Sequence, residues 1–237
     1  MRNDAIQTLP TADAWAEACA ARLADALAEG LSDNGRAVLA GAGGSTPSPI
    51  YARLAQIDLD WSRVTATLVD ERYVPETSPD SNAALMKRTL LTGRAAAAAF
   101  LPLYVPAVTV DRAAAEASKA LETQGGRLDA VLLGMGEDGH ICSMFPESPT
   151  LKTLLTPGLK PAVYGVPAGR DDLAPPQERL SINLPYLIGA RRVVLALTGA
   201  TKRAVFEREA ECDPRTHPIA AMIAAKVPLE VLWTEAV

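Results

Sequence analysis

Short apolar runs recur along this chain, and helical patterns follow most of them. A strand whose apolar residues are continuous is buried on both faces, which is typical of a parallel sheet covered by helices. We therefore predict an α/β fold, with one doubly wound, mainly parallel, Rossmann-like sheet and helices on both faces. The expected strands are 36–42, 64–74, 128–136, 191–199 and 227–233.

Helical periodicity indicates the connecting elements. In the first of them, apolar residues recur every three or four positions after Thr11, and Gly30 marks the expected end. The proline-bearing segment 167–180 is expected to be a long surface loop. No repeat or linker interrupts the pattern, so we expect a single domain over residues 1–237. The expected helices are 11–30, 81–91, 111–124, 201–209 and 218–226, together with one in the second part of 43–57 that follows the glycine loop and has Pro47 in its first turn.

Composition restricts the function classes. The net charge of -5 argues against broad binding to nucleic acid or an anionic membrane, so a local cation cluster must hold any anionic ligand. Neither a secretory signal nor a membrane-spanning run is evident, which favours a cytoplasmic location. The three cysteines, Cys19, Cys142 and Cys212, are widely spaced, so we expect neither a disulfide framework nor a zinc site.

The first candidate site is the loop GAGGSTP, residues 41–47, between a strand and a helix. Gly43 and Gly44 let the backbone approach a ligand closely, and Ser45 and Thr46 add hydroxyl donors near a helix N-terminus. The loop resembles a phosphate cradle, although it lacks the glycine of a dinucleotide fingerprint and the Gly-Lys pair of a Walker loop. A plain turn that caps a helix is the alternative.

The second candidate, DERYVPETSPDSN, follows an apolar strand. Asp70, Glu71 and Arg72 could be a solvated run of charges. Their position at the end of a buried strand instead favours a place in the ligand crevice, and the planar Arg72 donors suit phosphate. Ser81 and Asn82 are expected to cap the next helix.

The third candidate is GMGEDGHICSMFPESP, residues 134–149. Gly136 and Gly139 allow the backbone to bend around a substrate, and Asp138 lies two residues before His140, close enough to fix its tautomer or to hold the substrate. His140 is the natural general base. Cys142 is a weaker candidate, because adjacency in sequence does not supply a nucleophile with its base.

Two further cations complete the candidate site. Lys202 falls in the first turn of a helix, where its ammonium and the helix N-terminus could share an anion, although a surface lysine is the alternative. Arg179 is a less certain cation. One base with a clamp of cations suits a small sugar phosphate. The second histidine, His217, is expected at a helix start.

The motifs GGSTP, DERYVP with DSN, GMGEDGH with SMFPESP, RLSIN and TGATK resemble, in order and spacing, those of the 6-phosphogluconolactonases of the pentose phosphate pathway. Related glucosamine-6-phosphate deaminases share the fold, the GSTP loop and a DGH turn. They carry a glutamate five residues after the histidine, where this chain has Phe145, which favours the lactonase. Ile141 and Cys142 depart from the usual lactonase pattern.

The resemblance implies hydrolysis of 6-phospho-D-glucono-1,5-lactone to 6-phosphogluconate, with no metal or organic cofactor. His140 would activate water, Asp138 would orient it or hold the sugar, and the cations with the glycine loop would bind the 6-phosphate. The expected partner is the small lactone, without nucleic acid or membrane, in a monomer or weak homodimer. An amino-sugar phosphate deaminase and a noncatalytic sugar-phosphate sensor stay open as alternatives.

Overall fold

Seven strands form one sheet in which every neighbouring pair is parallel. The computed structural model describes residues 6–146, 148–169 and 176–236. Within these residues the order across the sheet is β1-β10-β9-β6-β2-β3-β5. The strands are β1 (Ile6–Leu9), β2 (Ala37–Gly41), β3 (Val64–Leu68), β5 (Ala99–Phe100), β6 (Ala130–Leu133), β9 (Arg192–Thr198) and β10 (Leu229–Thr234).

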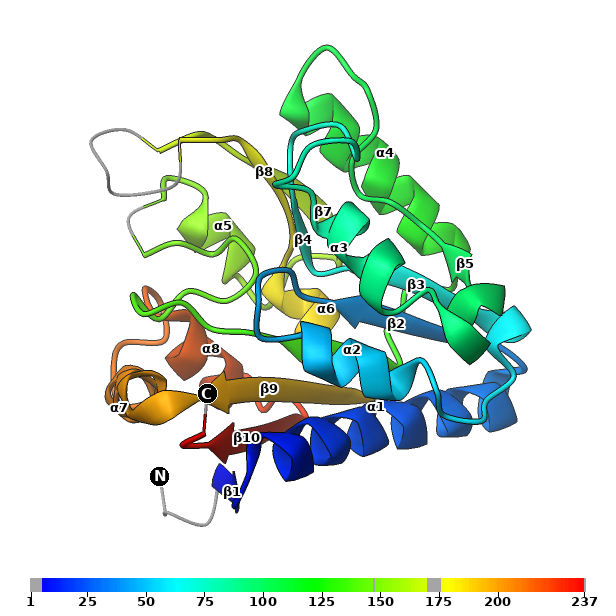
Figure 1. Cartoon of the computed structure of the whole chain (residues 1–237). Coiled ribbons are helices and arrows are strands. Elements are labelled where there is room, and N and C mark those ends of the chain that lie inside the picture. The colour runs from blue at the N-terminus through cyan, green and yellow to red at the C-terminus, as the bar shows by residue number, and fades with distance from the viewer. Residues whose placement is uncertain (1–5, 147, 170–175, 237) are drawn as a thin grey trace.

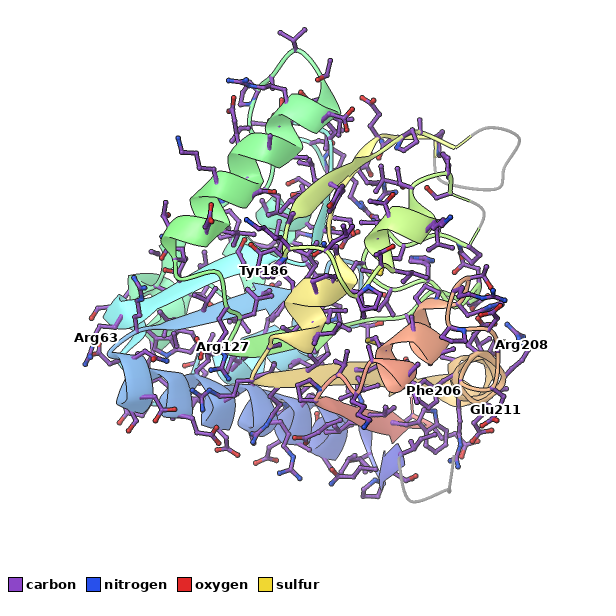
Figure 2. All side chains as sticks on the ribbon, turned by 180° about the vertical axis from the view of Figure 1, so that it is seen from behind. Arg63, Arg127, Tyr186, Phe206, Arg208 and Glu211 are labelled. Carbon is purple, nitrogen blue, oxygen red and sulfur yellow. The ribbon has the colours of Figure 1, made fainter. Side chains whose placement is uncertain are left out.

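Helices cover both faces of this sheet. The helix α2 lies in front of the strands in Figure 1, whereas α6 and α8 lie in front in Figure 2, which is seen from behind. The predicted mainly parallel α/β fold is therefore confirmed. The helices are α1 (Ala12–Asn34), α2 (Ser48–Leu54), α3 (Asn82–Thr89), α4 (Val110–Thr123), α5 (Leu151–Leu154), α6 (Leu184–Ile188), α7 (Gly199–Glu209) and α8 (Pro218–Ala224), with short 3-10 helices at Trp61–Arg63 and Gly93–Ala97.

A second sheet of three antiparallel strands, in the order β4-β8-β7, was not predicted. It consists of β4 (Asp70–Arg72), β7 (Val163–Val166) and β8 (Arg179–Ile182), and α4 packs against it (Figure 1). The prediction of one strand over 64–74 was wrong, because the chain leaves the main sheet after β3 and β4 pairs with β8. Periodicity cannot show which partner a strand takes.

The prediction of a surface loop over 167–180 was wrong for its last two residues. Arg179 and Leu180 belong to β8 and are buried, because β8 pairs on both sides, with β4 and with β7. Residues 170–175 of that prediction lie outside the described residues.

The first helix is longer than its sequence pattern suggested. Thr11 caps α1 as expected, since its hydroxyl accepts from the N–H of Ala14 at 3.1 Å. The predicted end at Gly30 was wrong. The helix continues to Gly35, whose φ of 71° is the left-handed conformation of a C-cap. Gly30 is instead a close contact, because a Cβ there would lie 2.6 Å from Cγ of Asp129.

The Asp129 carboxylate links several elements at this contact. It accepts from the N–H of Val38 at 2.9 Å and from Nε of Arg191 at 3.4 Å, and Asp129 itself is buried. Glycine at position 30 therefore lets α1 lie directly against the group that joins β2 to the start of β9.

The carboxyl ends of β2, β6 and β9 all lie at one edge of the main sheet, since these strands are parallel neighbours. The glycine loop after β2, the histidine loop after β6 and the start of α7 after β9 are thereby brought together. Among the described residues, no helix combines the length and apolar character needed to cross a membrane.

Replacing Gly30 with alanine should destabilise the protein by about 1 to 3 kcal/mol, because the new methyl group overpacks against Asp129. In an unconstrained helix interior the same change stabilises by about 1 kcal/mol. Urea unfolding followed by circular dichroism measures the difference.

Ser32→Ala is the matched control, since Ser32 is exposed on the same helix. It should leave the stability unchanged or raise it slightly. A Gly30→Ala protein more stable than wild type would contradict the described contact with Asp129.

Candidate active site

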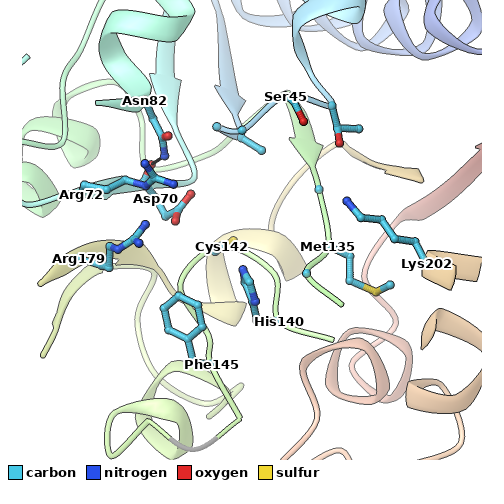
Figure 3. Close-up of a pocket in the computed structure, with 16 residues that line it drawn as sticks. Ser45, Asp70, Arg72, Asn82, Met135, His140, Cys142, Phe145, Arg179 and Lys202 are labelled. Atoms are coloured by element: carbon cyan, nitrogen blue, oxygen red, sulfur yellow. Dashed lines mark hydrogen bonds between the residues drawn. The ribbon is translucent and has the colours of Figure 1, made fainter. Parts of the chain in front are cut away.

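A cavity of about 400 Å³ opens at the carboxyl edge of the main sheet (Figure 3). Ten of the residues predicted for the site line it: Gly43, Gly44, Ser45, Thr46, Asp70, Arg72, Gly136, His140, Arg179 and Lys202. The other two, Asp138 and Gly139, do not line it and lie behind His140 in the same loop. The structure thus gathers residues from five separate segments around one space.

A tight turn after β6 presents His140 to the cavity. The N–H of Gly136 donates to the carbonyl of His140 at 2.9 Å, and the N–H of Gly139 donates to the carbonyl of Gly136 at 3.1 Å. A Cβ at Gly136 would lie 2.3 Å from the His140 ring, and Gly139 has a φ of 86°. Both glycines are therefore required for the place that the imidazole takes.

The Asp138 carboxylate fixes the orientation of the imidazole. Its Oδ1 lies 2.5 Å from Nδ1 of His140 and 3.2 Å from the backbone N of the same residue. Burial by itself raises the pKa of Asp138, but the hydrogen bonds and charge of His140 outweigh burial and hold that pKa below its ordinary value. An ionised Asp138 can only accept, so Nδ1 carries the proton and Nε2 is left to act as a base.

Two side chains beside the histidine are unreactive. The ring of Phe145 lies 4.5 Å from the imidazole, centroid to centroid, and both line the cavity. Burial, and then the charge of Asp70, raise the pKa of Cys142 well above its usual value. Because the thiolate is the nucleophilic form, this thiol is a poor candidate for covalent catalysis.

Two arginines meet on one wall of the cavity. Arg72 and Arg179 are paired residues of β4 and β8, and the Nε atom of each is buried without a hydrogen-bond partner among the described residues. Burial lowers the pKa of Arg179, and the like charge of Arg72 lowers it further. A bound anion would satisfy both donors and relieve the repulsion between the two guanidinium groups.

Lys202 and the glycine loop form the opposite wall. Figure 3 shows Lys202 directed toward the loop of Ser45, with Arg72 and Arg179 on the other side of the pocket and His140 between the two groups. Gly44 has a φ of 85°, and a Cβ at Gly43 would lie 1.8 Å from Oδ1 of Asn82. The loop geometry therefore depends on both glycines.

A buried carboxylate holds the arginine wall in place. Glu71 is fully buried, and its oxygens accept from the backbone N–H groups of Arg72, Asn82 and Ala83 at 2.7 to 2.8 Å and from the Ser81 hydroxyl at 3.0 Å. Burial raises its pKa, while these hydrogen bonds act in the opposite direction. Glu71 thus joins β4 to the start of α3. Glu71 therefore does not belong to a solvated run of charges, which was the alternative interpretation of residues 70–72.

Sequence reasoning missed several residues at the site. Asn82 was expected only to cap a helix, yet its amide lines the cavity and donates to the carbonyl of Asp70 at 2.9 Å. Ser81 is the actual cap, since its hydroxyl accepts from the N–H of Ala84 at 3.2 Å. Met135 also lines the cavity between the two loop glycines. The position of Met135 in the glycine loop, two residues after the end of β6, was the available signal.

The cavity offers acid–base and anion-binding groups. Within the described part of the chain, the clustered metal-ligand side chains are Glu209, Cys212 and His217, and none of them lines the cavity. A base with a free ring nitrogen beside two groups of cations can deprotonate water next to a bound anionic substrate.

The chain resembles known proteins in both sequence and fold. The sequence model described as glucosamine-6-phosphate isomerases/6-phosphogluconolactonase matches residues 10–233. The chain is 40% identical to 6-phosphogluconolactonases of Mesorhizobium japonicum and Caulobacter vibrioides, covering 92% of this chain in each case and 90% and 92% of the relatives. A crystal structure of a 6-phosphogluconolactonase from Shewanella baltica superposes with a TM-score of 0.88 at 32% identity, covering 97% of both chains.

Replacing Glu71 with glutamine should cost about 2 to 4 kcal/mol of stability, because the new NH₂ group faces two donors and leaves them without an acceptor. Thermal and urea unfolding measure the loss.

Glu76→Gln provides the matched control. Glu76 is half exposed and pairs with Lys87 at 2.7 Å, so its loss should change stability by less than about 0.5 kcal/mol. Equal effects of the two substitutions would argue against the bracing role of Glu71.

Proposed function

Since the chain belongs to the family of glucosamine-6-phosphate isomerases and 6-phosphogluconolactonases, we propose that it is a 6-phosphogluconolactonase whose general base is His140. The observation that carries the mechanism is the imidazole held by Asp138 at 2.5 Å, inside a cavity with cations on two sides. The substrate would be 6-phospho-D-glucono-1,5-lactone and the product 6-phosphogluconate.

The proposed reaction uses one proton carrier. Nε2 of His140 removes a proton from water as the water oxygen bonds to the lactone carbonyl carbon. When the tetrahedral intermediate collapses, the bond from that carbon to the ring oxygen breaks, and His140 returns the proton to this oxygen. Asp138 stabilises the transient imidazolium with its negative charge.

The cations would bind the 6-phosphate and so position the carbonyl against the water. Arg72 and Arg179 offer buried Nε donors, and Lys202 with the hydroxyls and backbone of Ser45 and Thr46 offers donors from the opposite wall. A phosphate has three terminal oxygens, so it can accept from both walls at once.

The side chain next to the histidine favours the lactonase over the deaminase. A phenyl ring, that of Phe145, packs on His140 at the position where the deaminases carry a glutamate. Ring opening of an amino sugar would lack that carboxylate. We therefore expect the protein to release no ammonia from glucosamine 6-phosphate. Turnover of the lactone, if measured, would exclude the alternative of a noncatalytic sugar-phosphate sensor.

An assay on freshly generated lactone, coupled to oxidation of the product, tests the proposal. Wild-type protein should accelerate hydrolysis, and His140→Ala should lower kcat by about 10²- to 10⁴-fold because the base is lost. Circular dichroism checks that the variant folds. A kcat close to that of wild type would remove His140 from the role of base.

Asp138→Asn separates the two roles open to Asp138. If the carboxylate serves the imidazole, kcat falls with little change in KM, because the ring is no longer held in the tautomer that leaves Nε2 free. An increase in KM alone would instead assign Asp138 to sugar binding.

Lys202→Gln should raise KM by roughly 10- to 100-fold with a small change in kcat, because one charge-assisted hydrogen bond to phosphate is lost. Lys119→Gln is the control, since Lys119 is exposed on α4 and does not line the cavity. Steady-state kinetics give the KM of both variants. An unchanged KM for Lys202→Gln would exclude the lysine from phosphate binding.

A further inference from the structure

Three potential metal ligands of different chemistry converge where α7 leads into α8. One ligand atom from each of Glu209, Cys212 and His217 lies within 4.8 Å of the other two. Figure 2 labels Arg208 and Glu211 in this region, beside α7 at the edge of the molecule. The cluster lies outside the cavity lining, so the proposed lactonase reaction does not use it.

Glu209 supplies a buried oxygen without a partner. The residue is only 4% exposed, and its Oε1 accepts from Nε and Nη2 of Arg208 at 3.2 and 3.0 Å. Its Oε2 is buried and accepts no hydrogen bond within the part of the chain that the structure describes. Burying a carboxylate oxygen without a hydrogen-bond donor costs free energy, and a bound cation would offset that cost.

The Nε2 atom of His217 lies near Oε2 of Glu209. Nδ1 of His217 lies 2.9 Å from the Thr216 hydroxyl and 3.2 Å from the backbone carbonyl of Asp213, and this carbonyl accepts a hydrogen bond in the tautomer that carries the hydrogen on Nδ1. The lone pair is then on Nε2, which lies 3.9 Å from Oε2 of Glu209. This separation is too long for a hydrogen bond. A carbonyl that holds the second ring nitrogen is the usual support of a metal-bound histidine.

The distances suit zinc after a small adjustment. Zinc–oxygen and zinc–nitrogen bonds of about 2.1 Å place two tetrahedral ligands about 3.4 Å apart. The three ligand atoms lie within 4.8 Å of one another, and His217 and Cys212 are only partly buried. A small movement that releases the thiol of Cys212 from the Arg208 carbonyl, 3.4 Å away, would bring the three atoms to bonding distance. A thiol, an imidazole and a carboxylate together favour zinc over magnesium or calcium.

We propose that Glu209, Cys212 and His217 bind a zinc ion, with a water molecule as the fourth ligand. Cys212 releases its thiol proton to solvent on binding, so the thiolate and the carboxylate balance the two positive charges of the metal. The proposal differs from the sequence-based expectation of no zinc site, which rested on the spacing of the cysteines, whereas two of the three proposed ligands are not cysteines.

The bound metal would also support the proposed active site from behind. A Cβ at Gly139 would lie 2.7 Å from Cδ of Glu209, so this carboxylate packs directly against the loop that carries His140. Zinc at Glu209 therefore connects the turn between α7 and α8 to that loop. Its role would be structural, since the cluster does not line the cavity.

The test is titration of the chelator-treated, reduced protein with Zn²⁺ by calorimetry, followed by Co²⁺ substitution. We expect one equivalent of zinc to bind, the melting temperature to rise by several degrees, and cobalt to give a thiolate charge-transfer band. Cys212→Ser and His217→Ala should each weaken zinc binding at least 10-fold and should abolish the rise in melting temperature.

His140→Ala and Cys142→Ala are matched controls, since the chain has only two histidines and Cys142 lies next to the other one. Both should bind zinc like wild type. Zinc binding that survives in Cys212→Ser and His217→Ala but disappears in the controls would place the metal in the cavity and overturn the proposal. The absence of one-equivalent binding to wild type would overturn it as well, whatever the lactonase assay shows.

Discussion

Parallel pairing of β2, β6 and β9 forces their carboxyl ends to one edge of the sheet, and the whole cavity depends on this constraint. Each strand is buried along its length and opens into a different loop at that edge. One loop brings backbone N–H groups, the next brings the imidazole, and the third brings Lys202 at the start of α7. None of these elements could bind a sugar phosphate alone.

The small antiparallel sheet supplies the two arginines of the cavity, Arg72 and Arg179. It places two arginines side by side in an acidic protein and buries part of each guanidinium group. Two like charges at this distance destabilise the empty protein, and the four hydrogen bonds of Glu71 hold β4 against α3 despite that cost. A bound anion would relieve this repulsion, which supports the proposed role of the two arginines in binding phosphate.

The loop of His140 is supported on two sides. Asp138 fixes the tautomer from within the loop, and Glu209 of α7 packs against Gly139 from behind. The proposed zinc ion would therefore act on the same loop as the substrate, although the two sites have no residue in common. In the proposed mechanism, this arrangement would separate the general base from the groups that keep it in place.

The sequence by itself determined five of the seven strands of the main sheet, their parallel arrangement and ten of the cavity-lining residues, because apolar periodicity and glycine-terminated strands are local properties of the chain. It also indicated Asp138, whose partner His140 is two residues away. Only the tertiary structure decided the pairing of β4 with β8, the buried role of Glu71 and the contact of Glu209 with Gly139. These depend on partners distant in the chain, and neither periodicity nor local spacing records which distant segment a residue meets.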